Sequence, residues 1–278
     1  MFHFCTTRNN GIAYLIWSFI LRSCGPFVSW LDGFYFGSSR GMNNYDSLAG
    51  SYKGSNVKPD KQYSILPTVL KLVGDCEGKE VVDIGCGGGF FTVPLAELGA
   101  SMVYGLDNSV AQIDIARKIS PHPNVRYFLS DAFVNRITSV DVVVAPFVPN
   151  YARTVPILRH FLTQIYNGLR QGGKVVLVVD LPNGKNLKRF GAVKKFLGPA
   201  EDETEISIEL WSGSDKVCDL RSVYFTKETI TRLLEEIGFS EVKWHEPIIS
   251  DEGIKLLGAD FWGGYTSDPE LGYLTASK

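Results

Sequence analysis

Several features that would place this chain in a specialised class of protein are missing from its 278 residues. The five cysteines form no Cys-x-x-Cys pair and no cluster with histidine, so we expect neither a disulfide framework nor a metal site. The formal net charge is −2, and no broad excess of lysine and arginine favours binding to nucleic acid or to an acidic membrane. There is no internal repeat and no low-complexity tract. These absences favour a globular protein in a reducing, cytoplasmic compartment.

The first 41 residues differ from the rest of the chain. Residues 11–21 (GIAYLIWSFIL) form an apolar run that is too short to span a bilayer but has the length of a signal-peptide core. Arg22 interrupts the run, and no convincing cleavage site follows. Two interpretations stay open: residues 1–41 are a mis-assigned start before Met42, or they are a targeting or membrane segment that would make the protein membrane-associated. We take residues 42–278 as the functional domain.

The hydrophobic pattern of that domain predicts an α/β fold. From Val81 onward, short β-rich runs alternate with helical stretches, as in a parallel sheet with crossover helices. Strands are expected at residues 81–84, 103–106, 125–129, 140–145 and 174–179, and helices at 60–73, 90–98, 109–119 and 155–169. Further on, we expect a basic loop or short helix at 181–200, a hairpin of strands 205–211 and 217–225, a helix from the Thr226 cap to Gly238, and closing strands at 241–245 and 271–276.

A glycine-rich turn follows the first of these strands, in the sequence VVDIGCGGGF of residues 81–90. Glycines at a strand-to-helix turn let the backbone approach a ligand closely. Phe90 stands where the dinucleotide fingerprint GxGxxG has its third glycine, so that fingerprint is broken. Asp83 would repel a pyrophosphate, but its carboxylate suits the cationic amino group of a methionine moiety. Gly85, Gly87 and Asp83 are therefore candidate cofactor-binding residues.

Two further acids follow the next two strands at the same interval along the chain. Asp107 ends the second strand, where a carboxylate can accept both hydroxyls of a ribose. Asp131 follows the third strand and can accept from an adenine amino group. The spacing from Asp83 to Asp107 equals that from Asp107 to Asp131, about one βα unit each. All three acids should lie at the carboxyl edge of adjacent strands, which predicts a nucleoside site.

At these residues the chain resembles the class I S-adenosylmethionine (SAM)-dependent methyltransferases, in particular the small-molecule branch with the ubiquinone and menaquinone methylases. The matching segments are VDIGCGGG at 82–89, GLDNS with Asn108, SDA with Asp131 and Ala132, DVVVAP ending at Pro146, and YDSLAGSY from Tyr45 to Tyr52. The resemblance implies SAM as cofactor, bound by these residues, with the two tyrosines closing over its methionine end. It also implies a Rossmann-like, doubly wound seven-stranded sheet in the order 3-2-1-4-5-7-6, with strand 7 antiparallel and a lid insertion after strand 5 at about 181–225.

The resemblance implies an enzyme that moves a methyl group to a small-molecule acceptor, on an oxygen, nitrogen or carbon atom that the sequence does not specify. Positioning can supply much of the rate, so no motif has to mark a general base. Tyr151, and after it Asn150, follow the fourth strand where the acceptor should approach, and they are the candidate catalytic residues. We interpret His160 and His122 as surface residues, His245 as structural and Cys86 as a small turn residue.

Two alternatives stay open at this point. One is a SAM-binding protein without catalysis; the other, less favoured, is an NAD-dependent oxidoreductase, which the broken fingerprint and the lack of a Tyr-x-x-x-Lys pair argue against. For partners we expect a small-molecule acceptor, no nucleic acid and no membrane for the domain, with the protein a monomer or homodimer. The basic cluster from Lys185 to Lys195 could attract an anionic acceptor, but we interpret it as a solvated loop face.

Overall fold

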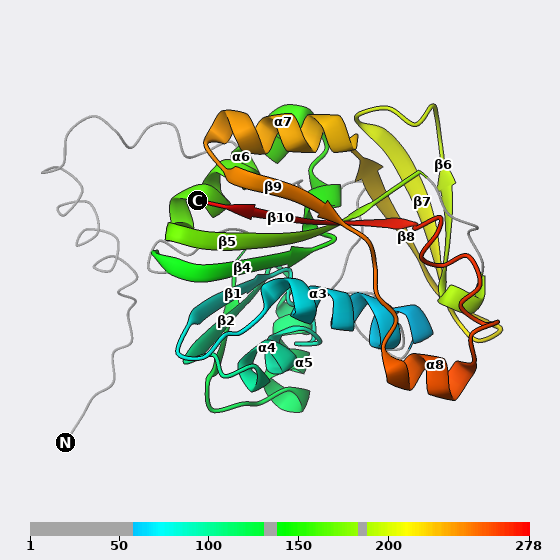
Figure 1. Ribbon diagram of the computed structural model, residues 1–278, viewed down its shortest axis with the longest axis horizontal. Helices are drawn as coiled ribbons and strands as arrows, with labels where there is room; N and C mark the ends of the chain where they lie inside the picture. Colours follow the sequence, from blue (N-terminus) through cyan, green and yellow to red (C-terminus); the bar gives the residue numbers. More distant parts are fainter. Residues whose placement is uncertain (1–57, 131–137, 183–187) are drawn as a thin grey trace, which may run out of the picture. The chain divides into compact units, whose positions relative to one another are not determined.

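Residues 58–130, 138–182 and 188–278 are described by the computed structural model of the chain, and they are built around one mixed sheet (Figure 1). The order of its seven strands is β3-β2-β1-β4-β5-β10-β9. Strands β1 to β5 run parallel, and β10 is antiparallel to both of its neighbours. The bounds are Glu80–Ile84 (β1), Met102–Asp107 (β2), Val125–Leu129 (β3), Val140–Pro146 (β4), Leu169–Asp180 (β5), Ser240–His245 (β9) and Leu271–Ser277 (β10). The predicted strand order and the antiparallel strand are confirmed.

Helices cover both faces of this sheet, because successive side chains of its central strands point to opposite sides. Val81 packs in one apolar cluster with α3 (Leu66–Val73), α4 (Thr92–Glu97) and α5 (Val110–Ile119). Its neighbour Val82 packs in another, with α6 (Val155–Gly168) and α7 (Lys227–Ile237). Figure 1 shows these two helix groups on opposite sides of the strands. All of β4 is buried, as its continuous apolar sequence predicts.

A second, smaller sheet follows β5, where the lid insertion was predicted. We call it the small sheet; it comprises β6 (Ala192–Phe196), β7 (Thr204–Ser212) and β8 (Asp215–Tyr224), in that order and all antiparallel. The predicted hairpin is β7 and β8. The prediction of a loop or short helix over 181–200 was wrong in part: a 3₁₀ turn, η4 (Lys188–Phe190), is followed by β6. The alternation that makes β6 a strand is hard to see in the sequence because one of its inward positions is a lysine.

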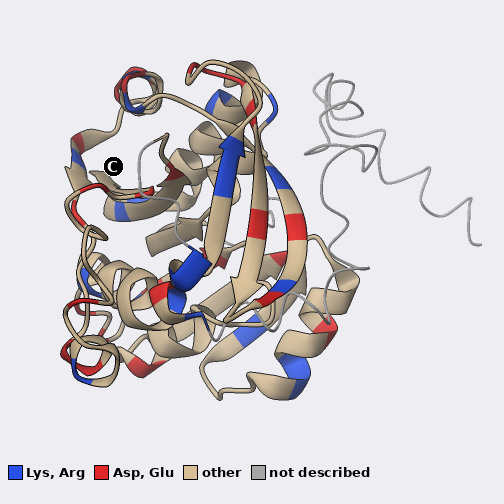
Figure 2. Ribbon diagram, turned by 90° about the vertical axis from the view of Figure 1, so that its right-hand side faces the viewer, with Lys and Arg blue, Asp and Glu red and all other residues tan. Residues whose placement is uncertain are grey.

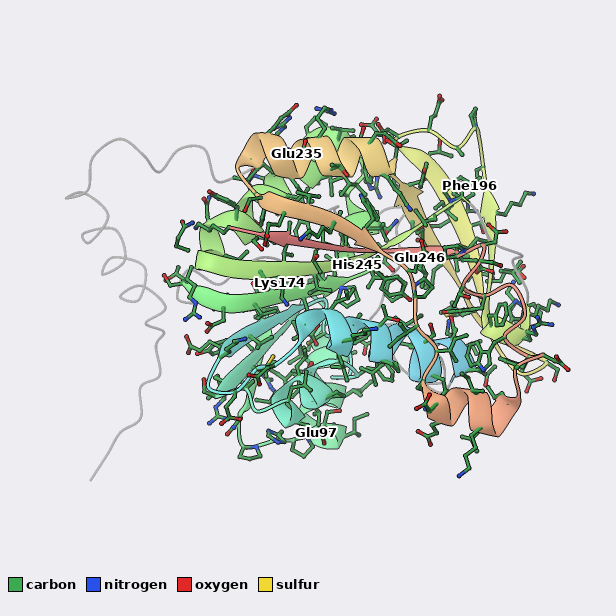
Figure 3. All side chains as sticks on the ribbon, in the orientation of Figure 1. Glu97, Lys174, Phe196, Glu235, His245 and Glu246 are labelled. Atoms are coloured by element: carbon green, nitrogen blue, oxygen red, sulfur yellow. The ribbon has the colours of Figure 1, made fainter. Side chains whose placement is uncertain are left out.

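Helix ends follow the expected capping chemistry. The Ser109 hydroxyl accepts a hydrogen bond from the Gln112 N–H, and the Thr226 hydroxyl accepts from the Thr229 N–H. Gly238, at φ 115°, ends α7 as predicted. The expected helix over 60–73 is a turn of π-helix, η2 (Lys61–Ile65), that continues into α3, and the ammonium of Lys174 on β5 binds the last carbonyls of α3 (Figure 3).

The short helix α8 (Asp251–Leu257) was not predicted. The proposed division at residue 41 lies outside the described residues. None of the helices in the described ranges has the length and hydropathy needed to cross a membrane.

The packing of α6 on the sheet gives a stability prediction. Leu162 is fully buried in the α6–α7 cluster, so Leu162→Ala should lower the free energy of unfolding by about 2–5 kcal/mol. Leu256→Ala, at a side chain that is 58% exposed on α8, is the matched control and should change it by less than about 0.5 kcal/mol. Urea unfolding followed by circular dichroism measures both; equal losses would contradict the described core.

Candidate active site

The glycine turn after β1 is built on left-handed backbone. Gly85, Gly87 and Gly89 have φ of 69°, 52° and 89°, a region that residues with a side chain rarely occupy. A Cβ at Gly85 would lie 2.5 Å from the Val148 side chain, so this glycine is also needed for close packing. At Gly87 the nearest atom, Gln112 Oε1, would be 3.8 Å away, an ordinary van der Waals contact, so glycine is required there by its backbone conformation rather than by lack of space.

Asp83 lies under this turn and is completely buried. Its Oδ2 accepts a hydrogen bond of 2.6 Å from the Thr92 hydroxyl, but within the described residues its Oδ1 has no hydrogen-bond partner. Burial raises the pKa of Asp83 to about 7, despite the opposing effect of the Thr92 hydrogen bond. A buried acceptor without a donor costs free energy, so this oxygen is suited to a donor brought by a ligand.

Lys61, on η2, is the cationic neighbour of Asp83, and no motif or spacing in the sequence singled it out. Its side chain is buried, and its ammonium lies 4.7 Å from the centre of the Phe90 ring. Burial, and then the charge of Lys58, lower the pKa of Lys61 to about 7, while Asp60 and Asp83 act in the opposite direction. Desolvation thus moves both Lys61 and Asp83 toward their neutral forms.

Asp107 holds the end of β2 against the glycine turn. Its Oδ2 accepts from the Gly87 N–H and its Oδ1 from the Ser109 N–H, both at 2.9 Å. The carboxylate is thus held beside the turn, and its contact with a ribose stays a prediction. Asn108 beside it is exposed. The predicted contacts of Tyr45, Tyr52, Asp131 and Ala132 fall outside the described residues.

A cavity of ≈ 80 Å³ lies between the large sheet and the inner face of the small sheet, at the edge where β4 and β5 end and β10 begins. That is several times the roughly 10–15 Å³ that one water molecule needs. Lys61 lines the cavity, so the cavity adjoins the Asp83 site. Much of its wall is apolar, from Ile65, Phe147, Ala192, Ile208, Leu210, Leu220 and Leu271.

The segment after β4 brings both predicted catalytic residues to this cavity. Pro146 is buried at the end of β4, and Phe147 follows with φ 68°, which is uncommon for a bulky residue and turns the chain into η3 (Val148–Tyr151). Asn150 and Tyr151 both line the cavity. The Asn150 amide donates to the Val223 carbonyl at 3.1 Å and accepts from the Asp180 N–H at 3.3 Å. These contacts assign Asn150 a structural task beside any catalytic one.

Two buried ion pairs also line the cavity, and sequence reasoning found neither. The Lys194 ammonium lies 2.6 Å from Asp180 Oδ1, and the Lys58 ammonium lies 3.6 Å from Asp60 Oδ2. All four side chains are less than one tenth exposed. Lys194 belongs to the basic cluster that was interpreted as a solvated face, and for this residue that interpretation was wrong.

The histidines and Cys86 behave as predicted. His160 is exposed, and the Nδ1 of His122 accepts from the Asn124 N–H in a loop. His245, labelled in Figure 3, belongs to β9, and its Nε2 lies 2.8 Å from the Thr275 hydroxyl. Burial raises the pKa of the Cys86 thiol well above its ordinary value, which makes it a poor nucleophile.

Comparison with known proteins gives one family and several relatives. Residues 81–173 match the methyltransferase domain family. The ubiquinone biosynthesis O-methyltransferase of Chelativorans sp. is 54% identical over 41 residues, which are 15% of this chain and 16% of that enzyme. The tRNA U34 carboxymethyltransferase of Pseudoalteromonas translucida is 28% identical over 181 residues, which are 63% of this chain and 49% of that enzyme. This chain thus spans about half or less of these two curated relatives.

The fold has solved counterparts as well. The S-adenosylmethionine-dependent methyltransferase from Mesorhizobium loti aligns with a TM-score of 0.56 at 19% identity, over 81% of this chain and 100% of that one. Likeness at this identity concerns the fold, which here is the sheet order with its one antiparallel strand. The matched family thus identifies a methyltransferase domain over residues 81–173, and the sheet order gives this chain the fold of the class I SAM-dependent methyltransferases.

Proposed function

We propose that this protein transfers a methyl group from SAM to a small molecule held in the cavity beside Lys61. The observation that carries the proposal is the junction of two sites: a glycine turn with left-handed backbone over a buried, incompletely hydrogen-bonded carboxylate, and a largely apolar cavity that Lys61, the neighbour of this carboxylate, also lines. When bound, SAM would supply a methyl group on a positively charged sulfur. An atom of the acceptor attacks the methyl carbon in line, and the sulfur is the leaving group. The nucleophile's lone pair forms the new bond, and the sulfur keeps the electrons of the old one.

The residues present fit this cofactor. The unpartnered Oδ1 of Asp83 can accept from the methionine ammonium, and the Lys61 ammonium can bind the methionine carboxylate. Each of these side chains is disfavoured in its charged form by burial, and each would gain an opposite charge from the zwitterionic end of the cofactor. Asp107 can take the ribose hydroxyls, and the sequence assigns the adenine amino group to Asp131 and the closing contacts to Tyr45 and Tyr52.

The cavity supports a small acceptor. Apolar walls exclude water, and holding an acceptor against the methyl group can by itself remove about 7–11 kcal/mol of barrier. Tyr151 lines this space and stays the first candidate for a direct contact with the acceptor. The two ion pairs place equal numbers of positive and negative charges at the wall, whereas a site for a polyanion gathers lysines and arginines on one face.

The similarity to a tRNA-modifying enzyme suggests RNA as a competing acceptor. The distribution of charged residues in Figure 2 helps to decide between RNA and a small molecule. Basic residues occur on β6, but acidic residues occur on the neighbouring strands of the small sheet, so its surface is mixed rather than basic. This charge pattern supports a small molecule over RNA. A protein that binds SAM without transferring its methyl group is the other alternative.

Calorimetry of the full chain with SAM, S-adenosylhomocysteine and NADH tests the cofactor. We expect micromolar binding of the two sulfur ligands and none of NADH, because the turn lacks the third glycine and holds a carboxylate. Binding of NADH alone would refute the proposal. SAM carrying a labelled methyl group, incubated with either total tRNA or a low-molecular-weight metabolite extract, tests the acceptor: we expect label in the metabolite fraction, and label in tRNA would replace the small molecule by RNA.

The ribose assignment predicts the effect of a substitution. Asp107→Asn should raise the Kd for S-adenosylhomocysteine at least tenfold, about 1.4 kcal/mol, because a charge-assisted acceptor is lost. Asp114→Asn removes a carboxylate that is 57% exposed on the neighbouring helix α5 and is the control. Equal affinities of the two variants in calorimetry would rule out a ribose contact.

The pKa of Asp83 predicts how stability depends on pH. Its folded-state value of about 7 lies above the ordinary 3.8, so folding takes up a proton between these pH values. The contribution of Asp83 to stability therefore falls as the pH rises from about 4 to about 7. Asp83→Asn should remove this fall in ligand-free protein and weaken binding of S-adenosylhomocysteine at least tenfold. Urea unfolding from pH 4 to 8 checks it; an unchanged pH profile would contradict the buried carboxylate.

A further inference from the structure

Asp180, the last residue of β5, joins the large sheet to the small sheet. Its Oδ1 pairs with the Lys194 ammonium of β6, and its Oδ2 accepts from the Ser222 hydroxyl of β8 at 3.1 Å. Its backbone N–H donates a hydrogen bond to the side-chain Oδ1 of Asn150 on η3. Asp180 thus connects four separate segments (β5, β6, β8 and η3) through its buried carboxylate and its backbone N–H, and it lies at the wall of the cavity.

The two side chains that bind Asp180 are polar, whereas the inner face of the small sheet on which they lie is otherwise apolar at the cavity. Strand pairing places Lys194 opposite Ile208, and Ser222 opposite Ile206, on the inner face of the small sheet. The other side chains on this face that line the cavity are apolar, among them Ala192, Leu210 and Leu220. A buried ion pair is rarely more stabilising than an apolar pair of similar volume, since both charges lose their hydration. The polar group at this point of the cavity is therefore better explained by binding than by stability.

The charges at the cavity wall indicate which ligand chemistry fits. The Lys194 charge is compensated by Asp180 and the Lys58 charge by Asp60, so neither lysine brings an uncompensated positive charge for an anion. Each oxygen of Asp180 carries one of the contacts above, and a carboxylate oxygen can accept two hydrogen bonds. Asp180 can therefore accept a further O–H or N–H.

Asp60, the other carboxylate at the wall, is less suited to this role. Its Oδ1 accepts from the Lys61 N–H at 2.7 Å, which caps its own helical turn. Asp180 is instead tied through Asn150 to the segment that follows β4, where the acceptor approaches.

We propose that Asp180 is the specificity-determining residue for the acceptor: it accepts a hydrogen bond from the hydroxyl or amine of an apolar, neutral or cationic small molecule. Carboxylates and phosphates are then poor acceptors, because they would meet the Asp180 carboxylate while Lys58 and Lys194 are held in ion pairs and Lys61 is assigned to the cofactor carboxylate. This inference rests on the proposed function and specifies its substrate class. Lys194 and Ser222 act as positioning residues that hold the Asp180 side chain.

Saturation-transfer NMR on the full chain in the presence of S-adenosylhomocysteine tests the proposal with four probes. Phenol and benzylamine carry a donor on an apolar body, anisole lacks the donor, and benzoate is an anion. We expect phenol or benzylamine to bind at least tenfold more tightly than anisole and benzoate. Equal binding of phenol, benzylamine and anisole, preference for benzoate, or no binding of either donor-bearing probe would overturn the proposal.

The double variant Asp180→Leu/Lys194→Met tests the residue itself. Replacing both charges by apolar side chains of similar size preserves packing, so the fold should survive. We expect the preference for phenol or benzylamine over anisole to disappear, while the Kd for S-adenosylhomocysteine stays within twofold. Lys216→Met/Asp219→Leu, which removes an exposed lysine–aspartate pair on β8, is the matched control and should keep the preference.

Different results would contradict the proposed function and the role of Asp180. If the wild-type chain binds no S-adenosylhomocysteine, the proposed function is wrong and the acceptor assignment falls with it. If it binds S-adenosylhomocysteine and the double variant keeps the wild-type preference for phenol or benzylamine, only the role of Asp180 is wrong.

Discussion

The burial of charge at the carboxyl edge of a parallel sheet is the constraint on which this structure depends. Asp83 lies at the end of a strand with helices on both faces, where water cannot hydrate it, and its pKa rises to about 7. Thr92 satisfies one of its oxygens and leaves the other without a donor. Lys61 is buried beside it, and burial lowers the pKa of its ammonium to about 7. A ligand that carries both an ammonium and a carboxylate brings an opposite charge to each of these buried side chains, so cofactor binding and local stability are linked.

The same edge explains why the small sheet lies where it does. The helices cover the two faces of the large sheet but leave the ends of β4 and β5 open, and the small sheet closes that end with an apolar inner face. The junction is the polar contact of Asp180 with Lys194 and Ser222. A contact between charged groups fixes an orientation, which apolar packing by itself does less well, and it lines the cavity with a directed hydrogen-bond acceptor.

The large sheet and the cofactor side of the site could be predicted because their determinants are local in the sequence. Hydrophobic runs with turn residues between them fix each strand and helix, and right-handed crossovers leave few arrangements for a parallel sheet. The glycine turn, Asp83 and Asp107 then meet because the carboxyl ends of adjacent strands share one edge. The strand β6 was missed, since Lys194 occupies a position where alternation calls for an apolar residue.

The sequence by itself therefore determined the fold class and the acids beside the glycine turn, and its resemblance to the methyltransferases implied the order of the large sheet. Only the tertiary structure decided the rest: that Lys61 is buried beside Asp83, and that Asp180, Lys194 and Ser222 meet at one cavity. These residues come from separate segments, and no period or spacing along the chain relates them. The functional roles of these residues depend on their desolvation and on distances across the fold, and both exist only once the small sheet has packed against the large one.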